Sequence, residues 1–239
     1  MSEMTAAEYC ERVGLQVPVA GIEQARASLT LALDDAKSAS VPSTPKSLAR
    51  LYEFKVPKLS ADGSCARFDD LAAAPYDLTE IFGGRTFMTT TRLMTLDVLV
   101  EHVERELSAG WLGVYQARET PRGNALVKLA YRGAASRAEF LLTAEFAAKS
   151  NNSTVAMTGK ASVVNDLQAH LKSGGSYYER DPKVRSEACL PVIKAGAVIG
   201  VIDAEHTSAH QFTATRLAML AALAIALPAF LPSGGLSIS

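Results

Sequence analysis

Residues 184–231 read VRSEACLPVIKAGAVIGVIDAEHTSAHQFTATRLAMLAALAIALPAFL, and the rest of the chain can be placed around them. Two runs rich in valine and isoleucine, 186–193 and 197–205, predict β-strands. The three residues between them end in a glycine that can take a positive φ, which predicts a hairpin turn. Thr213 can N-cap a helix that runs to about Leu227. The segment is therefore expected to fold as strand, tight turn, strand, loop and apolar helix.

The expected register of this hairpin brings acidic side chains together. With Ala195 at the centre of the turn, Glu187 lies directly opposite Asp203, and Glu205 shares the face of Asp203 because side chains alternate along a strand. Like charges directly across a strand pair are destabilising, so a proton, solvent or a cation must relieve the repulsion. One interpretation is a pocket for a cationic group such as an amino group. The alternative is that the acids lie at frayed strand ends in water.

Other motifs precede the hairpin in a definite order: WLGVY at 111–115, YRGAAS at 131–136 and STVAMTGKASVVNDL at 153–167. Together with the hairpin and the apolar helix, they resemble the GAF-fold free methionine-(R)-sulfoxide reductases over roughly residues 90–231. The resemblance implies an α+β fold, with a GAF-like central antiparallel sheet flanked by helices.

The resemblance divides the chain into two parts. Residues 90–239 are expected to form the GAF-like domain, which begins with an amphipathic helix at 90–107. Residues 1–89 are expected to form a partly helical, partly irregular N-terminal extension, because near-helical apolar spacing gives way to a proline-containing segment at 41–47. We expect the extension to have a structural role, covering a sheet face or building a dimer contact.

The sequence departs from that family at its reactive cysteines. The corresponding positions fall near Arg137, Asn152 and Arg180, and none of these residues is a cysteine. Reduction of a sulfoxide needs a thiolate nucleophile and usually a resolving thiol. The resemblance therefore implies a ligand pocket whose reactive sulfurs are absent.

The ligand-binding positions of the family are matched better in this sequence than its cysteine positions are. The acids that hold the substrate's amino group in the family carry over onto Glu187, Asp203 and Glu205. Trp111 and Tyr115 are expected to supply aromatic walls.

The polar loop at 168–185 contains two adjacent tyrosines, Tyr177 and Tyr178. Loops of this length are often functional lids, so these side chains are expected to close over a ligand. The alternative is that one of them anchors the loop to the sheet.

Composition excludes several classes of partner. The net charge is −1, with no basic stripe, so neither nucleic acid nor an anionic membrane surface is an expected partner. The uncharged run 217–231 is short for a bilayer crossing, which takes about 20 residues, and Pro228 interrupts it. A helix apolar on all sides is buried on more than one face, so a second helix, from the same chain or another subunit, is expected to cover it.

The cysteines and histidines predict neither a disulfide framework nor a metal site. Cys10, Cys65 and Cys189 are far apart in sequence, which fits a reducing cytoplasm. Cys189 shares the face of Glu187 and is expected to behave as a small buried residue. His206 and His210 lie in a loop, where their spacing does not set ligand geometry. No cofactor is expected.

These observations favour a cytoplasmic, non-catalytic GAF domain that binds a small polar ligand bearing an amino group, in a sensory or regulatory role. One alternative is a divergent free methionine-(R)-sulfoxide reductase that uses Cys189 or Cys65. A second is a structural dimerisation module that pairs through the helices at 90–107 and 214–231. A homodimer is expected, and a protein partner would carry any output because no output domain is apparent in the sequence.

Overall fold

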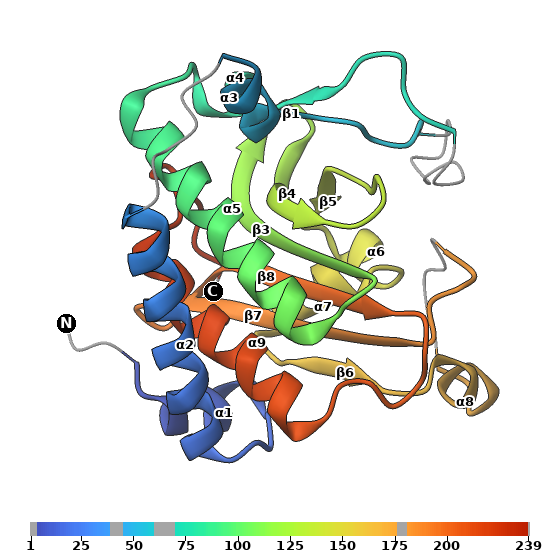
Figure 1. Ribbon diagram of the computed structural model, residues 1–239. Coiled ribbons are helices and arrows are strands. Elements are labelled where there is room, and N and C mark those ends of the chain that lie inside the picture. The colour runs from blue at the N-terminus through green and yellow to red at the C-terminus, as the bar shows by residue number, and fades with distance from the viewer. Residues whose placement is uncertain (1–3, 39–44, 60–69, 176–180, 239) are drawn as a thin grey trace.

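A six-stranded antiparallel sheet forms the centre of the molecule (Figure 1). The computed structural model describes residues 4–38, 45–59, 70–175 and 181–238. The strands of the central sheet are β3 (Trp111–Thr120), β4 (Gly123–Arg132), β5 (Glu139–Leu141), β6 (Ser162–Val164), β7 (Ser186–Lys194) and β8 (Ala197–His206). They lie in the order β5-β4-β3-β8-β7-β6, and every neighbouring pair is antiparallel. The predicted α+β fold with a central antiparallel sheet is confirmed.

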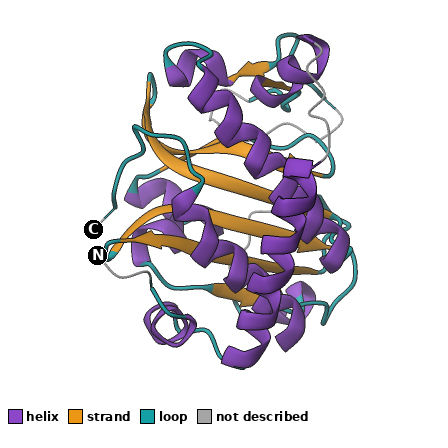
Figure 2. Cartoon of the chain, turned by 60° about the vertical axis from the view of Figure 1, so that its left-hand side comes forward, coloured by secondary structure: helices purple, strands orange, loops and turns teal. Residues whose placement is uncertain are grey.

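Three helices lie across one face of this sheet (Figure 2). They are α2 (Val19–Ser38), α5 (Phe87–Leu107) and α9 (Ala214–Ala226). Thr213 caps α9 as predicted, because its side chain accepts a hydrogen bond from the main chain of Arg216. Helix α9 packs on β7 and β8 on one side and on α2 and α5 on the other. The second helix that the apolar run was expected to need is therefore α2 of the same chain.

Shorter helices complete the described part of the molecule. They are α1 (Ala6–Val13), α3 (Pro45–Tyr52), α4 (Leu78–Phe82), α6 (Ala144–Ala147), α7 (Asn151–Thr158), α8 (Leu167–Lys172) and a 3-10 turn at Leu227–Ala229. Helix α7 packs on β7 and β8 from the face opposite α9, with α6 beside it. Within the described ranges, no helix combines the length and the apolar character needed to cross a membrane.

The described part of the N-terminal extension shares one hydrophobic core with the sheet. Ile22 and Leu29 of α2 are buried in the same cluster as the apolar residues of α9. Gly21 brings the two helices close together, since a β-carbon added there would lie 3.4 Å from the β-carbon of Ala218. The division into parts at residues 89 and 90 stays a prediction, but the extension packs as part of the molecule's core.

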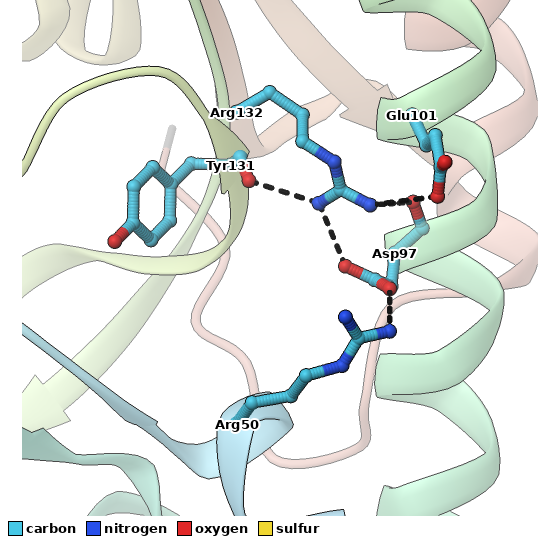
Figure 3. Close-up of polar contacts among 5 residues, drawn as sticks. All are labelled: Arg50, Asp97, Glu101, Tyr131 and Arg132. Carbon is cyan, nitrogen blue, oxygen red and sulfur yellow. Dashed lines mark hydrogen bonds and ion pairs between the residues drawn. The ribbon is translucent and has the colours of Figure 1, made fainter. Parts of the chain in front are cut away.

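An ionic network fastens α3 to α5 and β4 (Figure 3). Arg132 of β4 donates to Asp97 of α5 at 2.7 Å and to Glu101 of the same helix at 3.0 Å. Arg50 of α3 reaches the other carboxylate oxygen of Asp97 at 3.4 Å. Nearby, β1 (Glu53–Phe54) and β2 (Tyr76–Asp77) form a separate two-stranded sheet. One carboxylate on α5 thus links the extension to the central sheet.

The turn between β7 and β8 has two residues rather than the three expected. Lys194 pairs with Ala197, and Ala195 and Gly196 between them have φ values of 51° and 83°. Two positive φ angles are typical of a type I′ turn, whose twist matches that of the flanking strands. A bulge then leaves Ile199 without a partner, because its neighbours in β8 pair with consecutive residues of β7.

The shorter turn and the bulge shift the register by two residues. Glu187 lies opposite Glu205, and Asp203 lies opposite Cys189. The prediction that Glu187 faces Asp203 directly was therefore wrong. Side chains alternate with a period of two, so a shift of two residues keeps all three acids on the same face of the sheet.

Candidate functional site

Three carboxylates lie buried on the face of the sheet that α7 covers. The exposed fractions are 4% for Glu187, 1% for Asp203 and 5% for Glu205. The alternative that these acids lie at frayed strand ends in water is therefore wrong. Burying a carboxylate is costly unless hydrogen bonds or opposite charge compensate it.

Helix α7 supplies amide donors to two of these acids. Asn151 donates from Nδ2 to Oε1 of Glu187 at 2.6 Å, and Asn152 donates from Nδ2 to Oδ2 of Asp203 at 3.1 Å. Ser150 caps the helix by accepting a hydrogen bond from the main chain of Ser153. This cap fixes the first turn, so two consecutive side chains reach acids on two different strands.

A cavity of about 170 Å³ opens between this helix and the sheet. Its volume is below the roughly 300–1,000 Å³ of pockets for drug-sized ligands, so it suits a smaller molecule. The three acids form one wall of it. The remaining lining residues are Phe140, residues 147–152, Thr154, Ser162, Val164 and His170.

The predicted aromatic walls lie beside the cavity. Trp111 pairs with Glu205 across β3 and β8, and Tyr115 shares its face of the sheet. Neither residue lines the cavity. The ring of Phe140 does, and it packs edge-on against Tyr115 at a centroid distance of 5.3 Å. Tyr115 thus supports the cavity wall through Phe140, and Trp111 lies beside Tyr115 at a centroid distance of 6.2 Å.

The tyrosines predicted to form a lid fall outside the described residues. Tyr177 and Tyr178 belong to the segment 176–180, for which the structure gives no description. Their role over the ligand stays a prediction.

Sequence reasoning missed several residues that line the cavity. Asn151 follows a serine that can N-cap a helix, and this pattern was the available signal that its side chain lies at a helix start. Phe140 and His170 gave no such signal, because only the tertiary structure brings β5 and α8 to the same cavity.

The two spaced histidines are not brought together at a common ligand site. His206 accepts a hydrogen bond at Nδ1 from the main chain of Ser208. Burial lowers the pKa of His206, and the positive charge of Arg216 lowers it further. His210 lies 3.9 Å from Asp166 and takes a positive φ of 59°. Across the described ranges, no group of three or more histidine, cysteine, aspartate or glutamate side chains is placed to hold a metal ion.

The positions that correspond to the reductase cysteines are occupied by buried polar residues where they are described. Arg137 is buried, with its guanidinium 5.0 Å from the ring centre of Phe146. Asn152 holds Asp203. Arg180 lies outside the described residues.

Comparison with known proteins places this architecture in a family. A family model described as GAF domain matches residues 91–226, more than half of the 239 residues. The chain belongs to the GAF domain family. GAF domains typically bind small ligands in sensory or regulatory roles. A search among curated protein sequences finds no match to this GAF protein.

Solved structures of both enzymes and other GAF proteins are similar to it. A type II free methionine-R-sulfoxide reductase from Thermoplasma acidophilum is 20% identical, with 60% of this chain and 97% of that chain covered and a TM-score of 0.50. The free methionine-R-sulfoxide reductase from Neisseria meningitidis, in complex with its substrate, is 20% identical over 63% and 83%, with a TM-score of 0.46. The GAF domain of an Acinetobacter phosphoenolpyruvate-protein phosphotransferase is 16% identical over 64% and 87%, with a TM-score of 0.44. At these identities the likeness shows the fold alone.

Proposed function

We propose that this GAF domain binds a small polar ligand through the ligand's amino group, without catalysis, in a sensory or regulatory role. The observation that carries the proposal is the convergence of Glu187, Asp203 and Glu205, all buried, on one wall of a small cavity. A protonated amino group offers up to three N–H donors and a positive charge, which match buried carboxylate acceptors. The cavity volume of about 170 Å³ favours a ligand of small-metabolite size.

The placement of Cys189 supports the absence of catalysis. Cys189 is fully buried and does not line the cavity. Its Sγ donates a hydrogen bond to Asn152 at 3.1 Å. A thiol is a nucleophile as an accessible thiolate, whereas a buried thiol is usually inert. Cys65 lies outside the described residues. Thiol-dependent turnover of methionine sulfoxide that is lost on replacing either cysteine would revive the reductase alternative.

A thermal-shift panel tests the proposal directly. Purified protein would be melted with methionine sulfoxide, methionine, other amino acids, small amines and cyclic nucleotides. A ligand at a hundred times its dissociation constant adds about 2.7 kcal/mol to the free energy of unfolding, which raises the melting temperature measurably. Stabilisation by at least one amine is expected. If no amine in the panel raises the melting temperature, the proposal is wrong.

Asp203→Asn is the matched variant for this panel. Charge reversal at this position would bury a lysine, because Asp203 is 1% exposed, so the isosteric amide is the cleaner change. Truncating one partner of a buried charge pair costs roughly 2–5 kcal/mol, so affinity for the amine should fall about thirty-fold or more. Glu119→Gln, which removes an exposed carboxylate on β3, should leave affinity unchanged. Equal affinity in wild type and Asp203→Asn would exclude this wall of the cavity.

A further inference from the structure

Three buried side chains form a continuous set of contacts beneath the cavity. Asp203 and Cys189 face each other across β8 and β7, and Asn152 reaches both from α7. The exposed fractions are 1% for Asp203, 0% for Cys189 and 4% for Asn152. Of the three, Cys189 alone does not line the cavity.

The two ends of the Asn152 amide have different hydrogen-bonding capacities. Its Oδ1 only accepts, and its Nδ2 only donates. Oδ1 lies 3.1 Å from the Sγ of Cys189, and Nδ2 lies 3.1 Å from Oδ2 of Asp203. A rotated amide would turn its oxygen toward the carboxylate, where two acceptors would repel each other. The carboxylate of Asp203 and the thiol proton of Cys189 therefore both favour the orientation in which the amide donates to Asp203.

We propose that Cys189 and Asn152 are positioning residues of the ligand site. The thiol of Cys189 fixes the amide, and the amide holds Asp203 as a charged carboxylate at the cavity wall. The inference rests on the proposed function, in which Asp203 meets the amino group of the ligand. It gives Cys189 the role of a hydrogen-bond donor, which a hydroxyl can perform and a methyl group cannot.

The electrostatic surroundings make this donor important. Glu187 and Glu205 lie on the same face as Asp203, and their negative charges favour its protonated form. A hydrogen bond donated to the carboxylate favours its charged form. Three basic residues lie on or near the cavity wall: Lys149 and His170 line it, and the buried guanidinium of Arg137 lies 6.0 Å from the ring centre of Phe140, which also lines it. The thiol–amide pair thus acts against the neighbouring carboxylates and extends amine binding to lower pH.

Glu187 offers an internal comparison. Asn151 donates to it at 2.6 Å from the neighbouring position of α7. The first turn of this helix therefore places an amide donor against each of two acids, Glu187 and Asp203. The thiol of Cys189 contacts the amide that donates to Asp203.

The test combines a ligand-free measurement with a binding measurement. Carboxyl carbon NMR would follow the titration of Asp203, with its signal assigned by its absence in Asp203→Asn. Asn152→Leu, which keeps the size of the side chain and removes the donor, should move the titration midpoint to higher pH. Cys189→Ala should move it in the same direction by less, because the amide stays but loses one of its two orienting partners. Cys189→Ser should restore the wild-type midpoint, and Cys10→Ala, on α1, should leave it unchanged.

Amine affinity measured across pH gives the functional consequence. A hydrogen bond to a charged group is worth about 1.5–3 kcal/mol, so Asn152→Leu should weaken binding at neutral pH at least ten-fold. The pH below which Asn152→Leu loses amine affinity should rise together with the titration midpoint of Asp203. Rescue by Cys189→Ser would support the donor role, because a purely space-filling role would not move a pH profile.

Unchanged midpoints in both Asn152→Leu and Cys189→Ala would overturn the inference. Should Cys189→Ala fail to fold, Cys189→Val, which also lacks the donor, takes its place in the same titration. A wild-type protein that binds no amine would refute the proposed function, and the ligand-free titration would still support or overturn the positioning of Asp203. The two failures are therefore distinguishable.

Discussion

Trp111 lies across Gly113 in β3, which explains the glycine in the WLGVY motif. A β-carbon at Gly113 would lie 2.2 Å from the indole ring of Trp111. Gly200 in β8 is equally tight, because a β-carbon there would lie 2.2 Å from the main-chain oxygen of Tyr115. A side chain can turn aside, whereas this oxygen belongs to the strand that pairs with β8. Gly113 therefore leaves room for the indole ring of Trp111 on its own strand, and Gly200 allows β8 to approach β3 closely.

Alanine at these glycines should destabilise the fold to different degrees. Overpacking of this kind costs about 1–3 kcal/mol, and we expect Gly200→Ala to exceed Gly113→Ala because its clash is with main chain. Urea denaturation would give the free energies of unfolding. Gly110→Ala is the control, since the nearest atom to its added β-carbon lies at 3.6 Å. The close-packing account fails if all three variants unfold at the same urea concentration.

At the scale of elements, α2 acts as the outer layer over α5 and α9. Leu29 is 2% exposed on its inner face, whereas Leu31 on the same helix is 66% exposed. Ser28 adds a 2.9 Å hydrogen bond to His102 of α5. Packing on one face of α2 therefore holds the extension against the GAF domain.

Leu29→Ala and Leu31→Ala measure this packing as a matched pair. Truncating a buried leucine costs about 2–5 kcal/mol, so Leu29→Ala should lower the free energy of unfolding by that amount. Leu31→Ala should change it by less than about 0.5 kcal/mol. Chemical denaturation followed by Trp111 fluorescence would compare them. Similar small effects in both variants would contradict the packing of α2 on the domain.

The sequence predicted elements better than it predicted their pairing. The hairpin, the apolar helix and the common face of Glu187, Asp203 and Glu205 follow from periodicity, which a two-residue shift does not alter. The predicted register was wrong because a type I′ turn needs a positive φ at both central residues, and Ala195 does not signal one. The bulge at Ile199 adds the second residue of the shift. Asn151 was not predicted as a site residue because its contact with Glu187 depends on how α7 packs on the sheet.

At the scale of the whole molecule, the cavity and the three-helix layer lie on opposite faces of one sheet. Strands β7 and β8 carry the acids on one face and support α9 on the other. The dimerisation alternative would use the helices at 90–107 and 214–231, but α2 packs on both α5 and α9 within one chain. A dimer through that surface would require α2 to leave.

Deletion of residues 1–38 should expose this apolar surface. Eight residues of α9 are buried, and the helix contains no acidic residue. Large exposed apolar patches promote association, so the shortened protein should self-associate and unfold at lower denaturant concentration than the full chain. Light scattering at micromolar concentration, with Leu31→Ala in the full chain as control, would measure this. A shortened protein that stays monomeric and equally stable would contradict the covering role of α2.

The proposed function requires the buried carboxylates to recognise an amino group. Isothermal titration of the wild-type protein with the best amine from the thermal-shift panel, and with its analogue carrying a methyl group in place of the amino group, tests it most directly. We expect saturable binding of the amine and an affinity about thirty-fold or more lower for the analogue, because the acids would then be desolvated without a charged partner. Equal affinity for the two compounds would contradict it.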